Sequence, residues 1–142
     1  MVREGTIDEI LELISRIPEF REPYKRAEFE KRLGNTASLV LVEEKDGKLR
    51  GFKCGYERDA KTKTFYSWLG GVLPAYRRSA IATELLNAME DWCRESGYDF
   101  LSFKTLNQHK SMLIFAIKSD FEIVNVMPKK DEPSRIWLTK KL

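Results

Sequence analysis

The apolar positions along the chain recur with two periods, one helical and one alternating. Helical spacing predicts helices over residues 7–16, 24–33, 78–95 and 108–118. Alternating or continuous runs of β-branched and aromatic residues predict strands at residues 2–4, 38–43, 49–57, 64–72, 100–106, 121–126 and 135–139. In chain order the elements read β-α-α-β-β-β-α-β-α-β-β, which predicts an α+β fold whose sheet has mixed strand directions.

Start and stop signals support the first two helices. Thr6 and Glu9 have the form of a capping box ahead of the first. The second opens after Pro23 and ends at Gly34-Asn35, which are suited to a left-handed C-terminal position. Its expected inward residues are Tyr24, Ala27 and Leu33.

The third long strand, at residues 64–72, alternates aromatic side chains. Tyr66 and Trp68 are expected on one face of the sheet, and Phe65 and Leu69 on the other. Gly70-Gly71 near its end predicts a β-bulge, or a place where a ligand approaches the backbone closely.

Turns and loops separate the other strands. Asp46-Gly47 predicts a tight hairpin turn between the strands at 38–43 and 49–57. The polar stretch from Pro128 to Pro133 predicts a loop before the last strand.

Composition narrows the class of protein. A chain of 142 residues with 42% hydrophobic and 33% charged side chains suits one domain, residues 1–142. The net charge of +3 is too mild to indicate nucleic-acid binding, although it suits an anionic cofactor. Cys54 and Cys93 are expected as buried free thiols in a reducing compartment. With no leader and no long apolar run, we expect a cytoplasmic protein that does not bind membranes.

The segment from Gly70 to Ala82 joins a strand to the clearest helix through a basic turn rich in small residues. The first turn of a helix leaves backbone N–H groups unpaired at the positive end of the dipole, so it can hold a diphosphate. The alternative is an ordinary strand-to-helix turn with two solvated arginines, because short phosphate-loop patterns are weak evidence on their own.

This segment resembles the GNAT (Gcn5-related N-acetyltransferase) superfamily, whose motif follows a strand as Val-x-Pro-x-x-Arg, two residues, then Gly-x-Gly/Ala. Val72, Pro74, Arg77 and Ala82 match it. The resemblance continues from Asn107 through the following helix to Phe121, and the order of elements covers nearly the whole chain.

The resemblance implies acetyl-CoA as cofactor, an amine or peptide acceptor, and a sheet that is mostly antiparallel and sandwiched between helices. It also implies that backbone amides of the turn bind the pyrophosphate, while the strand end and the later Asn contact the pantetheine arm. The cofactor-binding residues that it implies are Val72, Arg77, Arg78, Ser79, Ala80, Ile81, Ala82 and Asn107.

The sequence departs from the family pattern at three positions. Ala80 replaces the first glycine of the phosphate motif and adds a Cβ near the phosphate oxygens. Asp120 replaces the glycine before Phe121, and aspartate tolerates turn conformations. Ala116 stands where many members have a tyrosine that protonates the leaving thiolate.

The sequence therefore leaves the identity of the catalytic residues open. Because amine attack requires loss of a proton, the candidates are Tyr66, Glu57 or a chain of water molecules. The aromatic residues near Tyr66 and Trp68 are expected in the core, next to the place where an acceptor would lie. The single histidine, His109, cannot form a triad or a metal site and is expected at the surface, so no metal is predicted.

Three functions are compatible with the sequence. The first is an acetyl-CoA-dependent N-acetyltransferase in which the acceptor amine attacks the thioester directly in a ternary complex. The second is a degenerate member that binds CoA as a sensor or interaction module. The third is an α+β binding protein without CoA affinity. The acceptor stays open, and the resemblance allows a homodimer.

Overall fold

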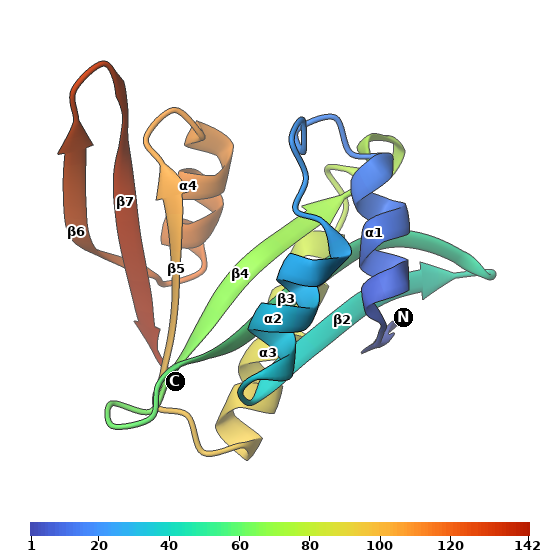
Figure 1. The fold of residues 1–142 in the computed structure, drawn as a ribbon, viewed down its shortest axis with the longest axis horizontal. Helices are drawn as coiled ribbons and strands as arrows, with labels where there is room; N and C mark the ends of the chain where they lie inside the picture. The colour runs from blue at the N-terminus through green and yellow to red at the C-terminus, as the bar shows by residue number, and fades with distance from the viewer.

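The computed structural model describes residues 1–142. The protein is built on a seven-stranded mixed sheet with helices on both faces (Figure 1). The strands are β1 Val2–Glu4, β2 Ser38–Lys45, β3 Lys48–Asp59, β4 Thr64–Val72, β5 Phe100–Leu106, β6 Glu122–Lys129 and β7 Glu132–Lys141. The helices are α1 Ile7–Ser15, α2 Arg26–Gly34, α3 Ile81–Glu95 and α4 Lys110–Lys118, with a 3-10 turn at Pro74–Tyr76.

The strands lie in the order β1-β2-β3-β4-β5-β7-β6. Every neighbouring pair is antiparallel except β4 and β5, which run parallel. The predicted α+β class, the mixed sheet and the order of elements are therefore confirmed.

Each face of the sheet has its own hydrophobic core. On one face α3 and α4 pack through Leu85, Met89 and Leu113 against the strands. On the other, α1 and α2 pack through Leu13 and Phe29. Burying these side chains stabilises the fold by about 1.5–3 kcal/mol each, and the sheet is held as the middle layer.

The two N-terminal helices begin and end close to their predicted positions. Thr6 and Glu9 form the expected capping box of α1. The second helix was predicted to begin two residues too early, because α2 begins at Arg26 and leaves Tyr24 outside. Its buried residues are Phe29 and Leu33, so the predicted inward positions of Tyr24 and Ala27 are wrong.

The bulge of β4 lies at Trp68 rather than at Gly70-Gly71. Cys54 pairs with Leu69 and Gly55 with Ser67, which leaves Trp68 as the extra residue, whereas both glycines pair in regular register with β3. The extra residue breaks the alternation, so Leu69 packs on the α1–α2 face and not beside Phe65 as predicted.

The glycine at position 71 is explained by close packing and not by a bulge. A Cβ there would lie 2.9 Å from Cδ1 of Ile17. The glycine therefore lets the residues after α1 lie directly against β4.

Two further boundaries differ from prediction. The third helix begins at Ile81, so Arg78 precedes it in an irregular turn. The predicted loop at 128–133 is instead a tight hairpin in which Lys129 pairs with Glu132. Asp131, with a φ of 62°, supplies the left-handed residue that this turn requires.

Cys54 and Cys93 are unpaired and buried, as expected. Burial raises the pKa of each thiol to about 12, so both are unreactive at neutral pH. No helix has the length and apolar character needed to cross a membrane.

Candidate active site

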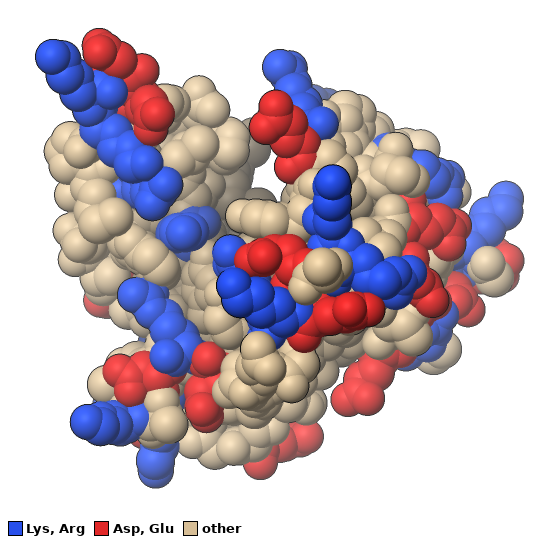
Figure 2. All heavy atoms as spheres, in the orientation of Figure 1, with Lys and Arg blue, Asp and Glu red and all other residues tan.

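β4 and β5 run side by side only at their beginnings. Residues 64–66 pair with residues 100–102, and beyond them the strands diverge although β4 continues to Val72 and β5 to Leu106. Figure 1 shows the resulting V, and Figure 2 shows it as an open cleft between the β6–β7 lobe and the rest of the molecule.

The edge of β4 that faces the V has free backbone groups. The N–H of Leu73 donates to the carbonyl of Arg50 on β3 at 2.9 Å. Since hydrogen-bonding directions alternate along a strand, Val72 and Gly70 direct their N–H groups into the V instead. An extended molecule with amide groups could pair with this edge as an added strand does.

The turn before α3 presents a continuous row of unpaired N–H groups. None of the amides from Arg78 to Thr83 donates to a backbone carbonyl, and the first bond of the helix is from Glu84 N to Ala80 O at 2.8 Å. Together with the helix dipole, these amides form a cradle for an anion at the open end of the V. This arrangement fits the diphosphate of CoA.

The backbone of the cradle explains the replacement of glycine by Ala80. Its φ is −78° and its ψ 3°, a conformation that any residue adopts. The strained residue is Arg78, whose φ of 61° lies in the left-handed region and costs about 1–2 kcal/mol. Its exposed guanidinium forms no ion pair, which leaves its charge available to a phosphate.

Arg77 has a different role from its neighbour. Its guanidinium donates two hydrogen bonds of 2.7 Å to the carboxylate of Glu19, and its Nε donates to the carbonyl of Val72 at 3.1 Å. These hydrogen bonds from Arg77 also lower the pKa of Glu19. Arg77 therefore fastens the loop after α1 to the end of β4, while Ser79 donates to the carbonyl of Tyr76 and closes the turn.

The second half of the expected cofactor site lies across the V. Asn107 follows β5, where its N–H donates to the carbonyl of Ser134 and its side-chain oxygen accepts from Lys110. Asp120 adopts a φ of 71°, so it does replace glycine in the bend after α4. Ala116 is buried in the α3–α4 core, so this position supplies no acid.

The two catalytic candidates lie on opposite faces of the sheet. Tyr66 packs on the α1–α2 face, whereas Glu57 accepts a hydrogen bond from Tyr98 on the α3 face at 3.1 Å. Burial raises the pKa of Tyr66 to about 12, so at neutral pH its phenol is uncharged. The structure does not bring Tyr66 and Glu57 together.

A buried hydroxyl lies where β4 and β5 part. Ser102 pairs with Tyr66 at the last parallel position, and its Oγ is buried without a hydrogen-bond partner. Because Leu101 faces the α3–α4 core, Ser102 faces the α1–α2 side. An unsatisfied buried hydroxyl is costly, which marks the base of the V as a place for a polar ligand group.

A group of cations that the sequence did not predict lies near this point. The guanidinium of Arg58 lies 3.9 Å over the ring of Trp137, and Lys104 lies 5.5 Å from the same ring. These residues come from β3, β7 and β5, so no local sequence pattern could have joined them.

Comparison with known proteins agrees with this geometry. The model of the acetyltransferase (GNAT) family matches residues 7–116. The chain belongs to the acetyltransferase (GNAT) family. The GNAT chemistry is transfer of an acetyl group from acetyl-CoA to an amine, and the resemblance expected from the sequence is confirmed. Curated proteins contain no sequence match to this GNAT chain.

Solved structures share the GNAT fold along almost the full length. The ribosomal-protein-S18-alanine N-acetyltransferase from Escherichia coli is 14% identical, with a TM-score of 0.83 and coverage of 99% of this chain and 92% of its own. Ard1 from Thermoplasma volcanium is 19% identical, with a TM-score of 0.83 and coverage of 100% and 97%. An aminoglycoside 6'-N-acetyltransferase complexed with coenzyme A is 18% identical, with a TM-score of 0.81 and coverage of 99% and 96%.

Proposed function

We propose that this acetyltransferase binds acetyl-CoA along the open edge of β4 and transfers the acetyl group directly to an amine that enters from the α1–α2 face. The row of unpaired amides from Arg78 to Thr83 is the observation that carries the proposal. The cofactor-binding residues are Val72, Arg77, Arg78, Ser79, Ala80, Ile81, Ala82 and Asn107.

Different residues bind different parts of acetyl-CoA. The amides of the turn and the charge of Arg78 hold the diphosphate, while Arg77 keeps the loop after α1 against β4. The N–H groups of Val72 and Gly70 pair with the pantetheine arm, and Asn107 contacts it from β5. Bound in this way, acetyl-CoA supplies the activated acetyl group at the base of the V.

Proton transfer falls to Tyr66 and water. With a pKa of about 12, the Tyr66 phenol is neutral and passes a proton only as a relay, accepting one from the amine while giving its own to water. A CoA thiolate resembles that of cysteine, with a free pKa of about 8.5, so it can leave without the acid that Ala116 lacks.

Titration calorimetry with acetyl-CoA tests the proposal. Arg78→Gly removes a charge at the cradle and relieves its left-handed backbone. Lys63→Gly is the matched control, because Lys63 is also an exposed cation with a positive φ of 54°, in the turn between β3 and β4. We expect Arg78→Gly to weaken binding about tenfold and Lys63→Gly to leave it unchanged.

The same experiment separates the alternative functions. No binding of acetyl-CoA by the intact chain would overturn the proposed site. Binding without acetylation of any amine would favour a CoA sensor. Since Cys54 and Cys93 are buried, thiol reagents can follow CoA release with little background.

We also propose that the protein is a cytoplasmic homodimer. Two buried, unpaired thiols suit a reducing compartment. β6 is an edge strand with exposed apolar side chains, and such an edge is commonly covered by another chain. The exposed residues are Ile123, Val124, Val126 and Met127. Light scattering tests the dimer, and Val124→Lys is expected to give monomers.

A further inference from the structure

An aromatic floor covers the α1–α2 face of the sheet beside the V. The rings of Tyr66 and Trp137 lie 5.8 Å apart, and Tyr56 lies edge-on to Tyr66 at 5.4 Å. Trp68 extends the floor on the far side of Tyr56, at 6.0 Å. The buried hydroxyl of Ser102 lies beside Tyr66. This is the face from which an acceptor reaches the base of the V.

Cations surround the floor. Arg58 and Lys104 lie over Trp137, at 3.9 and 5.5 Å from its ring. Arg135, two residues before Trp137 on the same strand, faces the same side. None of these three cations forms an ion pair within the chain. Figure 2 shows Lys and Arg atoms on the β6–β7 side of the cleft.

The pKa of Lys104 responds to this unbalanced charge. Its pKa is lowered, first by partial burial and then by the positive charges of Arg135, Arg32, Arg58 and Lys129. Of these charges, those of Arg58 and Arg135 are not paired with any carboxylate of the chain. A negative group placed between them and Lys104 would therefore be bound favourably.

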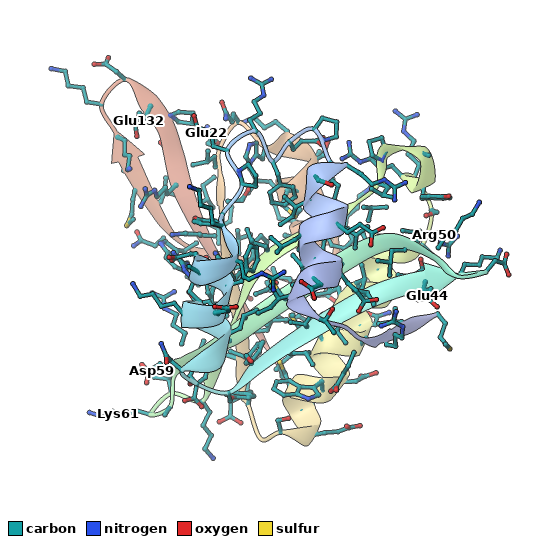
Figure 3. All side chains as sticks on the ribbon, turned by 45° about the vertical axis from the view of Figure 1, so that its right-hand side comes forward. Glu22, Glu44, Arg50, Asp59, Lys61 and Glu132 are labelled. Atoms are coloured by element: carbon teal, nitrogen blue, oxygen red, sulfur yellow. The ribbon has the colours of Figure 1, made fainter.

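The nearby carboxylates do not balance the charges of Arg58, Lys104 and Arg135. Glu28 is held by Arg32 at 2.7 Å and Glu132 by Lys129 at 3.4 Å. Glu57 lies on the opposite face with Tyr98. Figure 3 shows Glu132 on the β6–β7 hairpin and Glu22 on the loop between α1 and α2.

We propose that the acceptor amine is carried on an anionic molecule, whose carboxylate or phosphate binds Lys104 and Arg58 beside Trp137. The inference rests on the proposed acetyl transfer and names the acceptor class of that site. An acceptor with only positive charge would be repelled by the same cations. A tethered anion instead holds the amine at the base of the V, and the surrounding charges favour loss of the amine proton.

Matched pairs of acceptors test the inference by acetyl-CoA-dependent CoA release. Phenylalanine is compared with phenylalanine amide, and O-phosphoethanolamine with ethanolamine, so that each pair differs in its anion. The two pairs also distinguish a carboxylate from a phosphate as the group recognised. We expect kcat/KM for the better anionic acceptor to exceed that of its partner by at least about tenfold, through KM. Spermidine is expected to be a poor acceptor.

Variants of Lys104 test whether its charge causes the preference for anionic acceptors. Lys104→Met keeps the aliphatic stem but removes the charge, and it is expected to abolish most of the preference by raising KM for the anionic acceptor. Lys104→Glu is expected to reverse the preference. Lys61→Met is the control, since Lys61 is an exposed lysine in the turn between β3 and β4, where Figure 3 labels it.

A binding measurement tests the inference even if none of these four amines is acetylated. Calorimetry on the CoA-loaded protein compares N-acetylphenylalanine with its amide, and N-acetyl-O-phosphoethanolamine with N-acetylethanolamine. Tighter binding of an anionic product, lost in Lys104→Met, supports the inference. Equal binding within both pairs, or equal turnover of both acceptor pairs, overturns it while leaving acetyl transfer intact. Failure to bind acetyl-CoA or CoA would instead overturn the proposed function.

Discussion

Replacing Ala80 by proline removes one N–H group from the cradle ahead of α3. The φ of −78° at Ala80 is within the range that proline adopts. Its N–H donates to no backbone carbonyl, and its carbonyl still accepts the first hydrogen bond of the helix from Glu84. The folded state therefore loses no internal hydrogen bond.

The bound state loses a hydrogen bond to a charged phosphate oxygen. Such bonds contribute about 1.5–3 kcal/mol, and every 1.4 kcal/mol changes affinity about tenfold, so the dissociation constant of acetyl-CoA should rise about ten- to a hundredfold. Calorimetry measures this directly. Ala80→Gly, which keeps the N–H and removes the Cβ, should bind at least as tightly as the native chain.

Thermal melting checks that Ala80→Pro is folded. Undiminished affinity in a folded Ala80→Pro protein would contradict the assignment of these amides to the diphosphate. Equal loss in Ala80→Gly would show that the side chain, and not the N–H, decides binding.

Three further predictions concern the close packing beside the β-bulge, the proton relay through Tyr66 and the buried carboxylate of Glu43. A Cβ on Gly55 would lie 2.3 Å from the carbonyl oxygen of Tyr66, so Gly55→Ala should lower the free energy of unfolding by about 3 kcal/mol in urea denaturation. Gly70→Ala, whose Cβ meets its nearest neighbour at 3.4 Å, should change that free energy by less than about 1 kcal/mol; equal effects would contradict the bulge geometry. Tyr66→Phe should lower kcat about a hundredfold with unchanged acetyl-CoA affinity, and an unchanged kcat would leave proton transfer to water alone. Hydrogen bonds from Arg50 lower the pKa of the buried Glu43, so the stability it supplies is present above its ordinary value of 4.5 and lost as pH falls through the lower folded value. Glu43→Gln should cost about 2 kcal/mol at pH 7 and flatten the fall in stability below pH 4.5, which denaturation across pH measures; a parallel curve would refute the linkage.

Local signals in the sequence were enough for the types and order of the elements. The capping box at Thr6 and the left-handed turn at Asp46-Gly47 depend on neighbouring residues, and both occur as predicted. The motif from Val72 to Ala82 also lies within one short segment. Its match to a known pattern therefore indicated the family and cofactor before any long-range contact was known.

The width of the V and the place of the bulge required the tertiary structure. Gly70-Gly71 is the natural sequence signal for a bulge, but register depends on how β3 and β4 pack with both helical layers. The clash that a side chain at Gly55 would make with the Tyr66 carbonyl shows how tightly the strands meet beside the true bulge at Trp68.

The residues proposed to bind the acceptor are likewise brought together only in the tertiary structure. Arg58, Lys104 and Trp137 come from three strands, and Arg77 meets Glu19 across 58 positions of sequence. Sequence spacing carries no distance information over such separations. Side chains far apart in the chain become one charged surface only when sheet order and register bring their strands together, because contacts between strands are set by the whole packed sheet and not by any segment of it.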